Sequence, residues 1–215
     1  MPERITPRQF HEAPGVEDWR VLFHGASACF RTGSFAAGVA LVDAIGTLAD
    51  AANHHPDVDL RYSAVTVRLV THEVDGLSDR DVALARQISG AARELGIAAD
   101  PTAVQDVQVA IDALVRRHVM PFWRAVLGYR DTDDDDHLVD HRSRGPSFFF
   151  QQLDAPRAQR NRIRVDMPHD QAEARVAAAI AAGGRMVSDA HAPTCWTLAD
   201  AEGNEVDLAT WMGPG

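Results

Sequence analysis

The sequence predicts an α+β protein with two domains: an N-terminal antiparallel four-stranded sheet with helices on one face, in the order ββαββα, and a C-terminal pair of βαβββ modules. Two observations lead to this prediction. Short runs of alternating apolar and polar residues, typical of strands, flank stretches whose apolar residues recur every three or four positions, as on one face of a helix. In addition, a chain of 215 residues suits two domains of about 100 residues each. We expect the domains at residues 1–99 and 103–215, joined by a linker within residues 97–102.

The first domain is predicted to begin with a hairpin over residues 19–31, where apolar side chains recur on either side of a turn. A helix then starts after Ser34, a good N-cap. It stops near Asn53, because Pro56 lacks an amide donor and disfavours helical torsions in the residue before it. The expected apolar stripe of this helix consists of Phe35, Val39, Val42, Ile45 and Leu48.

A second hairpin is predicted over residues 58–69, in which apolar residues again alternate with polar ones. Ser78 can cap the helix that follows, and Gly96 is a stop signal at its end. The expected apolar stripe of this second helix consists of Val82, Ala85, Ile88 and Leu95.

The second domain is predicted to contain the same succession of elements twice. One βαβββ module alone would leave a sheet edge and an apolar face uncovered, whereas two modules can cover each other. The first module is expected as a strand at 104–112, a helix at 121–128, a gap with the acidic run 133–136 and a strand at 147–153; the second is expected as a strand at 160–167, a helix at 170–184 and strands at 185–189, 195–200 and 205–211.

Composition and charge exclude several classes of protein. The 46% hydrophobic and 24% charged fractions are ordinary for a globular chain, and a net charge of −10 without a basic run argues against nucleic acid as a partner. The N-terminus has no apolar signal-like region and no uninterrupted apolar stretch approaches membrane-spanning length, so we expect no membrane partner and a cytoplasmic location. Cys29 and Cys195 lack a Cys-x-x-Cys spacing, which predicts free thiols rather than a disulfide or a zinc site.

The densest functional signal lies between Asp50 and Asp81. His54 and His55 form a pair at the predicted helix end, and His72 follows a strand that can lie alongside this end. Such an arrangement would bring three imidazoles to one cleft. Because imidazole can both donate and accept a proton near neutral pH, the cluster points to general acid–base chemistry.

Two other interpretations of the three histidines are compatible with their spacing. Nearby imidazoles can bind zinc, although adjacent residues such as His54 and His55 tend to project in different directions and lack the i, i+4 spacing of two ligands on one helix face. The histidines can also be a helix-capping pair and an unrelated residue at a strand end. Spacing alone does not choose between these interpretations and an acid–base site.

The same segment resembles the pterin-4a-carbinolamine dehydratase family. The family signature is an acidic residue, three residues, His-His-Pro, five residues, an aromatic residue, nine residues, His, eight or more residues, and Asp. In this chain its seven positions are Asp50, His54, His55, Pro56, Tyr62, His72 and Asp81. The words FAAGVALVDAIGTLADAANHHPD and THEVDGLSDRDVALA are also similar to the family, so the resemblance covers about residues 16–95. The N-terminal helix that such domains often carry is expected to be shortened, because the chain before Trp19 is short and contains Pro and Gly.

This resemblance implies a 4a-hydroxytetrahydrobiopterin dehydratase, which converts a small-molecule pterin, 4a-hydroxytetrahydropterin, to quinonoid dihydropterin and water. It implies no cofactor and no metal: one imidazole protonates the departing 4a-hydroxyl and another takes the N5 proton. His54 and His72 are the two implied acid–base residues, without an assignment of which donates and which accepts; His55 orients the substrate, and Asp81 and Asp50 fix the histidine tautomers or raise their basicity. The implied catalytic residues are thus His54, His55, His72 and Asp81, and the implied substrate-binding residues are Asp50, Asn53, Pro56, Thr71 and Glu73.

The second half is similar to glyoxalase-like domains of the vicinal-oxygen-chelate superfamily, through the repeated βαβββ pattern and the words FWRAVLGY, RNRIRVDM and LADAEGNEVDLATW. Such domains often hold a divalent metal with four side chains from strands. The positions that most resemble those ligands are Asp106, Gln152, Arg164 and Asp207. Arg164 is a cation without a lone pair to donate, so no metal site is expected. The acidic run at 133–136 is expected to be a solvated loop.

Two alternative functions remain open from the sequence. The first domain can be a non-catalytic dimerisation or regulatory module, in which the histidines have lost their role. Alternatively, the protein can be a small-molecule-binding glyoxalase-like protein with an accessory N-terminal domain. In either case small sheets with open edges favour association, so we expect a homo-oligomer.

Overall fold

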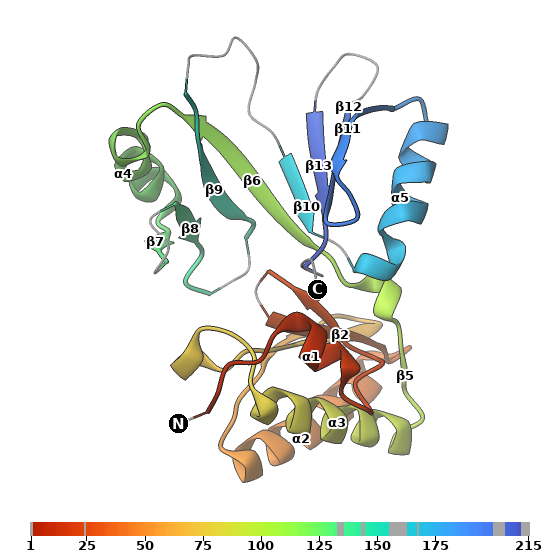
Figure 1. The fold of residues 1–215 in the computed structure, drawn as a ribbon. Coiled ribbons are helices and arrows are strands. Elements are labelled where there is room, and N and C mark those ends of the chain that lie inside the picture. Colours follow the sequence, from red (N-terminus) through yellow and green to blue (C-terminus); the bar gives the residue numbers. More distant parts are fainter. Residues whose placement is uncertain are drawn as a thin grey trace. The chain divides into compact units, whose positions relative to one another are not determined.

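A computed structural model describes residues 2–23, 25–132, 136–142, 145–154, 163–166, 168–199 and 205–211. The chain divides into two compact units, Met1–Gln105 together with Trp211–Gly215, and Asp106–Thr210. Figure 1 shows the elements of both units in chain order. Parts of the predicted acidic loop and of two predicted strands, at residues 133–135, 160–162, 167 and 200, lie outside the described residues.

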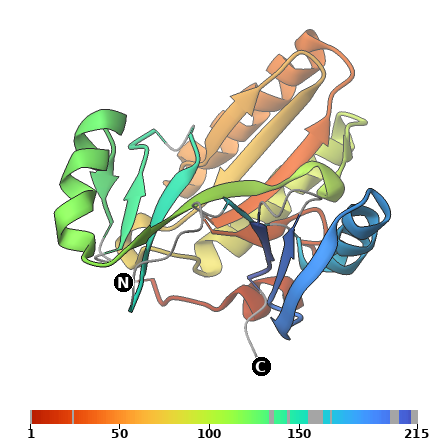
Figure 2. The same ribbon diagram turned by 90° about the horizontal axis from the view of Figure 1, so that it is seen from above.

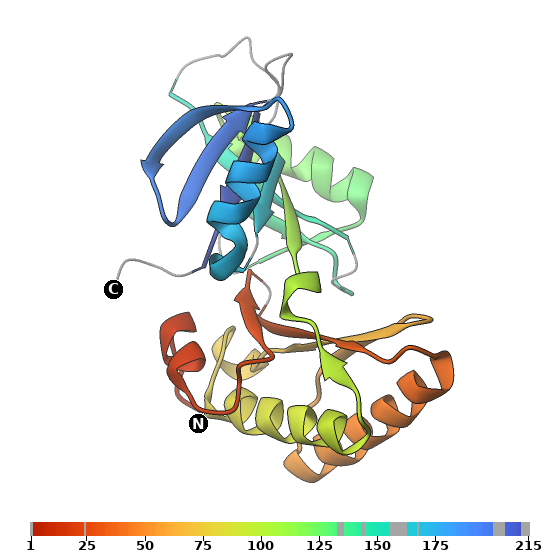
Figure 3. The same cartoon turned by 90° about the vertical axis from the view of Figure 1, so that its right-hand side faces the viewer.

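The first unit contains an antiparallel sheet of strand order β1-β2-β4-β3, and a short fifth strand, β5, pairs with β2. Helices α2 and α3 lie side by side on one face of this sheet (Figure 3). The arrangement confirms the predicted α+β class and the ββαββα order, with one strand more than predicted. The elements are α1 Pro7–Glu12, β1 Arg20–Leu22, β2 Gly25–Arg31, α2 Phe35–Ala52, β3 Asp57–Leu60, β4 Ala64–Leu69, η1 His72–Val74, α3 Asp79–Glu94, β5 Ala98–Ala99 and η2 Pro101–Ala103.

The core of the first unit lies between β4, its neighbour β2 and the two helices. In β4, Val65, Val67 and Leu69 are fully buried, and the residues between them are only partly buried. Because alternate residues of a strand point to opposite faces, these three share the face toward the helices. They belong to one apolar cluster with Leu41 and Ile45 of α2. The predicted alternation of this hairpin therefore sets which face of the sheet the helices cover.

The apolar stripe of α2 differs from the predicted one. Ile45 is buried and Val42 and Leu48 are partly buried, but Phe35 and Val39 are about half exposed. The buried side of the helix instead consists of Gly38, Leu41, Ile45 and Ala49.

Gly38 lies on this buried side. A Cβ atom at this position would lie 2.5 Å from Cδ1 of Leu60, so the glycine lets α2 approach β3 without a shift of the Leu60 side chain. With this side of the helix turned to the sheet, the two larger apolar residues at its start point outward. The predicted stripe of α3 is also wrong in one position, because the helix ends at Glu94 and the exposed Leu95 already belongs to its C-cap.

The segment predicted as a linker is part of the first unit. Ile97 is buried in the apolar core, and Ala98 and Ala99 pair with Arg31 and Phe30 of β2. Asp100 then donates its backbone N–H to the carbonyl oxygen of Cys29, at an N···O distance of 2.7 Å. The Asp100-Pro101 interruption ends a strand here rather than beginning a flexible connection.

The second unit contains an eight-stranded sheet of order β11-β12-β13-β10-β6-β9-β8-β7. β6 runs parallel to β9, β10 runs parallel to β13, and β6 and β10 meet antiparallel at the centre. The two modules therefore contain the same order of strands, counted outward from the contact between β6 and β10, which confirms the predicted repeat. The elements are β6 Asp106–Ala113, α4 Arg116–Leu127, β7 Arg130–Asp131, β8 His137–Val139, β9 Ser147–Gln152, β10 Ile163–Asp166, α5 His169–Ala181, β11 Arg185–His191, β12 Cys195–Ala199 and β13 Glu205–Ala209.

The two faces of this sheet differ in polarity. One face carries apolar clusters that pack against α4 in the first module and α5 in the second; these are the green and blue helices in Figure 2. The other face carries polar residues on the central strands, among them Gln108 and Arg164, which are paired across β6 and β10. β7 and β8 occupy the region predicted as a gap and lie on either side of the acidic run.

One helix of the described residues, α2, is long and apolar enough to cross a membrane by length and composition. Asp43 and Asp50 interrupt its apolar sequence, and its buried side belongs to the core of the first unit. Core helices of soluble proteins pass the same test, so the finding does not make α2 a membrane span.

Candidate active site

The C-terminal end of α2 directs two adjacent histidines to different places. Asn53 has φ 46° and ψ 45°, a left-handed conformation, and donates its N–H to the carbonyl of Asp50, while the N–H of His54 reaches back to Ala49. This pattern of bonds is that of a Schellman helix end. After this turn the His54 side chain is only 7% exposed and that of His55 is 60% exposed. The two imidazoles therefore project in different directions, as adjacent residues tend to do.

The buried imidazole of His54 is held by Asp81 in the first turn of α3. Nε2 of His54 lies 2.7 Å from Oδ1 of Asp81. The other carboxylate oxygen, Oδ2, accepts hydrogen bonds from the hydroxyl of Thr71 at 2.6 Å and from the backbone N–H of Ser78 at 2.8 Å. Asp81 has no exposed surface, and donors from three segments of the chain satisfy it. This is the bonding pattern of a buried carboxylate rather than of a carboxylic acid.

Ser78 joins this network to the start of α3. Its backbone N–H binds Asp81 and its hydroxyl accepts from the N–H of Arg80 at 3.2 Å, which forms a capping box with aspartate in place of the usual glutamate. The hydroxyl also lies 2.7 Å from that of Thr71. The sequence identified Ser78 as a helix cap but not as part of the site. The Ser-x-x-Asp spacing is the signal that could have shown it.

The contact with Asp81 also fixes the tautomer of His54. A carboxylate oxygen can only accept, so Nε2 must carry the proton that lies between the two groups. In neutral His54 the lone pair is then on Nδ1, the nitrogen that can accept a proton. The buried pair therefore prepares one imidazole nitrogen as a base.

The remaining predicted residues lie nearer the surface. Nε2 of His55 is 2.9 Å from Oδ1 of Asp50, and both side chains are mostly exposed. His72 directly follows Thr71, and its carbonyl accepts from the N–H of Asp75 at 3.2 Å; its side chain is exposed and makes no hydrogen bond to the described residues. Pro56 leads into β3 and is partly buried. The aromatic residue of the signature, Tyr62, is exposed in the turn between β3 and β4 and does not join the network.

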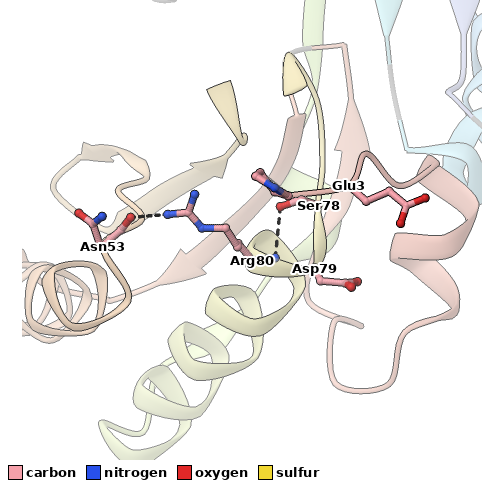
Figure 4. A pocket seen from close by; sticks show the side chains of 6 residues that line it. Glu3, Asn53, Ser78, Asp79 and Arg80 are labelled. Atoms are coloured by element: carbon pink, nitrogen blue, oxygen red, sulfur yellow. Dashed lines mark hydrogen bonds between the residues drawn. The ribbon is translucent and has the colours of Figure 1, made fainter. Parts of the chain in front are cut away.

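Arg80 connects the two histidine-bearing segments at the surface. Nη1 of Arg80 lies 2.9 Å from Oε1 of Glu73, and Nη2 donates to the backbone carbonyl of Asn53 (Figure 4). The bond from its own backbone N–H, followed by the bond from Arg80, lowers the pKa of Glu73 below its ordinary value. Sequence analysis did not select Arg80, and no spacing in the sequence marks it.

A pocket of about 470 Å³ opens beside this contact. Figure 4 labels five of the residues that line it, Glu3, Asn53, Ser78, Asp79 and Arg80; Pro2 completes the lining. Asn53 is the predicted substrate-binding residue that lines the pocket. The lining does not include His54, His55, His72 or Asp81. It includes Asn53, the residue before His54, and Ser78, which binds the carboxylate that holds His54.

The described residues contain no group of three or more His, Cys, Asp or Glu side chains placed to hold a metal ion. In the first unit, the carboxylates bind the imidazoles instead of converging with them: Asp81 is bound to His54 and Asp50 to His55. The arrangement is suited to proton transfer.

In the second unit, three of the four positions that resemble metal ligands share the polar face of the sheet. Arg164 and Asp207 are register partners on β10 and β13, and Asp106 on β6 is opposite Asp166, two residues along from Arg164. The hydroxyl of Thr197 donates to Asp207 at 2.7 Å. Arg164, which cannot ligate a metal, thus lies on the strand between those of Asp207 and Asp106.

Gln152 lies on the other face. Its partner on β6 is Ala113, seven residues from Asp106, so the alternation of the strand places it opposite the polar face. Its side-chain amide donates to the carbonyl oxygens of Leu114 and Leu153, at 2.6 and 2.9 Å. The four positions therefore do not fit a metal ion.

The fold and the site define the first unit as a small α+β domain with a buried histidine–carboxylate pair, and the second as a unit of paired βαβββ modules. Comparison with known proteins agrees with both descriptions. The family model for pterin 4 alpha carbinolamine dehydratase matches residues 3–91, and that for a glyoxalase-like domain matches residues 108–209.

Relatives of the first unit carry the same family name. A protein of Nocardia farcinica, provisionally named a pterin-4-alpha-carbinolamine dehydratase, is 45% identical over 78 residues, which are 36% of this chain and 82% of that protein. One of Roseiflexus sp., with the same provisional name, is 36% identical over 89 residues, 41% of this chain and 96% of that protein. A solved transcriptional coactivator/pterin dehydratase from Brucella melitensis is 24% identical, with a TM-score of 0.40, over 42% of this chain and 99% of its own.

The chain belongs to the pterin 4 alpha carbinolamine dehydratase family through its first unit, and its second unit matches the family model of a glyoxalase-like domain. The resemblance found in the sequence is thereby confirmed for both halves.

Proposed function

We propose that the first unit is a 4a-hydroxytetrahydrobiopterin dehydratase, a lyase that converts 4a-hydroxytetrahydropterin to quinonoid dihydropterin and water. The observation that carries the proposal is the buried contact of 2.7 Å between His54 and Asp81, which leaves a lone pair on Nδ1 of an imidazole. His55 and His72, from the two segments beside it, are exposed to solvent and can reach a ligand.

In the proposed reaction His54 is the base. Nδ1 accepts the proton from N5 of the pterin, and the electrons of the N–H bond form the double bond between N5 and C4a. The imidazolium that results is stabilised by Asp81, whose carboxylate accepts the Nε2 hydrogen bond and stays ionised, as in a histidine–aspartate pair of a serine protease.

His72 is the proposed acid. It protonates the 4a-hydroxyl as the bond between C4a and oxygen breaks, and water leaves. One proton is given and one is taken, so the reaction needs no oxidant, no reductant and no metal. Solvent can restore both histidines to their starting states, because His72 is exposed and a proton can pass through water to His54.

The substrate would be held by the residues around the two histidines. His55, supported by Asp50, orients the ring, and Asn53, Pro56 and Glu73 supply contacts around it. Asn53 lines the pocket, and Glu73 is anchored by Arg80 beside it. Thr71 is fully buried, with its hydroxyl bound to Asp81 and its backbone bound to Gly76, so its part in substrate binding would be to hold Asp81 in place.

The test is the loss of 4a-hydroxytetrahydropterin followed by absorbance, with the purified full chain against the uncatalysed rate. We expect acceleration by the natural chain, and a loss of about 10²- to 10⁴-fold in kcat for His54→Gln and for His72→Ala. His191→Ala, which removes an exposed histidine of the second unit, is the control and should keep full activity. If His54→Gln and His72→Ala behave like this control, the proposed acid–base roles are wrong.

We further propose that the protein works in the cytoplasm and forms a homo-oligomer. Neither cysteine forms a disulfide: Cys29 is buried, and this burial raises the pKa of its thiol, while Cys195 is partly buried. Cysteines outside disulfides suit a reducing compartment. Sedimentation of the full chain tests the second part, and a mass equal to that of one chain at assay concentration would exclude the oligomer.

A further inference from the structure

The three histidines of the site come from two separate segments. His54 and His55 follow the end of α2, and His72 opens the short helix after β4. Any reaction that uses an acid from one segment and a base from the other depends on the distance between them. Two neighbouring residues in the first turn of α3 each bind both segments.

The first of these residues, Asp81, joins the segments in the protein interior. It accepts from the imidazole of His54 on one side and from the hydroxyl of Thr71 on the other. The second residue, Arg80, joins the same two segments nearer the protein surface. It donates to the carbonyl of Asn53, the residue before His54, and to the carboxylate of Glu73, the residue after His72.

We infer that Arg80 is a positioning residue for the site: its guanidinium holds the end of α2 and the turn at His72 at a fixed separation. The inference rests on the proposed function in that the separation matters for proton transfer. Arg80 itself acts through Asn53 and Glu73 and not on the reacting atoms. Figure 4 shows its side chain reaching from α3 to Asn53 across one wall of the pocket.

The geometry requires an arginine. The two bonds leave from different nitrogens, Nη1 toward Glu73 and Nη2 toward Asn53, and the planar guanidinium presents both at a fixed angle. A lysine ammonium is a single point on a flexible chain and can serve one partner well. The Arg80 side chain is 32% exposed and that of Glu73 is 55% exposed, so the ion pair lies at the surface and the geometry of the two bonds matters more than the charge attraction.

The bond to Asn53 also supports the conformation of the helix end. Asn53 is one of two described non-glycine residues with positive φ, and a left-handed conformation is less favourable for it than for glycine. A donor on its carbonyl stabilises the turn that sends His54 inward. Loss of Arg80 should therefore loosen both residues 53–55 and residues 71–75.

The experiment compares Arg80→Gln and Arg80→Lys with Arg86→Gln. Arg86 is the matched control, because it lies on the same helix and also donates to a backbone carbonyl, that of Pro14, at 2.5 Å. We expect Arg80→Gln to lower kcat by about 10- to 100-fold with little change in KM, since small displacements of reacting groups cost rates of this order. Arg80→Lys should be intermediate, and Arg86→Gln should match the natural chain.

A double variant tests whether Arg80 acts through its carboxylate partner. If it does, Glu73→Gln should cost much less in the Arg80→Gln background than alone. Additive losses, a loss confined to KM, or equal kcat for Arg80→Gln and Arg86→Gln would each overturn the inference. A loss confined to KM would make Arg80 a substrate ligand instead.

Amide hydrogen exchange provides a readout that does not depend on activity. We expect faster exchange at residues 53–55 and 71–75 in Arg80→Gln but not in Arg86→Gln. Unchanged exchange there would also overturn the inference. A natural chain without dehydratase activity would overturn the proposed function, and the exchange comparison then decides separately whether Arg80 holds the two segments together.

Discussion

Nε2 of His54 and Oδ1 of Asp81 are 2.7 Å apart in the interior of the first unit, and the other oxygen of the same carboxylate closes the capping box of α3. The Asp81 side chain thus both holds the proposed base and caps the start of α3. A substitution that removes the carboxylate would affect both, so the chemistry and the stability of this unit can be separated only by changes that keep the cap.

Asp81→Asn is such a change. The amide oxygen can still accept from Ser78 and Thr71, but the amide nitrogen now donates to Nε2 of His54 and forces the proton onto Nδ1. The imidazole then holds the wrong tautomer, and we expect kcat to fall by about 10²- to 10⁴-fold while the thermal midpoint changes little. The dehydratase assay and circular dichroism measure the two effects. Asp43→Asn, an exposed carboxylate on α2, is the control; full activity of Asp81→Asn would contradict the tautomer argument.

His54→Ala and His72→Ala should both inactivate the protein but differ in stability. Removal of His54 leaves the buried carboxylate of Asp81 without one of its donors, which should cost about 1–3 kcal/mol in the free energy of unfolding. His72 is exposed, and its removal should change that free energy by less than about 0.5 kcal/mol. Urea denaturation gives both values, and equal destabilisation would show that the His54 contact is not a buried one in solution.

Ser78→Ala should reduce both stability and activity. Loss of the cap hydroxyl costs about 0.5–2 kcal/mol, and the hydroxyl network that holds Asp81 loses a member. Ser34→Ala is a matched control, because Ser34 caps α2 by accepting from the N–H of Ala37 at 3.2 Å. We expect similar losses of stability from the two variants but lower kcat only in Ser78→Ala. Equal activity would mean that the Ser78 hydroxyl is a helix cap and nothing more.

The contribution of Asp100 to stability should depend on pH. Hydrogen bonds from Thr102, followed by one from Arg31, lower the pKa of Asp100 below its ordinary value of 3.8. A carboxyl group with a lowered pKa in the folded state stabilises fully above its unfolded pKa, and this stabilisation is lost as the pH falls through the folded value. Asp100→Asn should therefore be less stable than the natural chain at neutral pH, with a difference that shrinks below pH 3.8. Denaturation curves across this range check it, and a difference independent of pH would contradict it.

Divalent metal ions should have no effect on the second unit. Arg164 cannot donate a lone pair and Gln152 lies on the opposite face, with its amide bound to carbonyl oxygens. After incubation with Zn²⁺ or Mn²⁺ and removal of the excess, we expect substoichiometric metal and an unchanged thermal midpoint. Stoichiometric metal that is lost in Asp207→Asn would show that the polar face binds metal with a different set of ligands.

Most of the fold could be predicted from the sequence because its signals are local. Ser34 and Ser78 cap the helices expected after them, and the alternation through Val65, Val67 and Leu69 marks a buried face. The residues whose burial was predicted wrongly are those whose environment is set by contacts between distant segments. Phe35 and Val39 point outward because the side of α2 that carries Gly38 and Leu41 is turned to the sheet, and periodicity within one helix cannot show which side a neighbouring strand approaches.

The residues of the candidate site could be predicted from local spacing in the sequence, but the contacts between them could not, because these join distant segments. The spaced signature marks the histidines and both carboxylates, but it does not state which groups bind each other. The structure pairs His54 with Asp81 and His55 with Asp50. Arg80 has no signature position, and its two partners lie 27 and 7 residues away, so only the folded arrangement shows what it connects.

The pairing of β5 with β2 bears on how the first unit can be cut out for separate study. The family match ends at residue 91, but Ile97 fills part of the core, Ala98 and Ala99 complete the sheet, and Asp100 binds Arg31. A fragment ending at residue 91 would lose these contacts and expose the edge of β2 at Phe30 and Arg31 to other chains. An expression clone of this unit should therefore run through residue 105, where the compact unit ends.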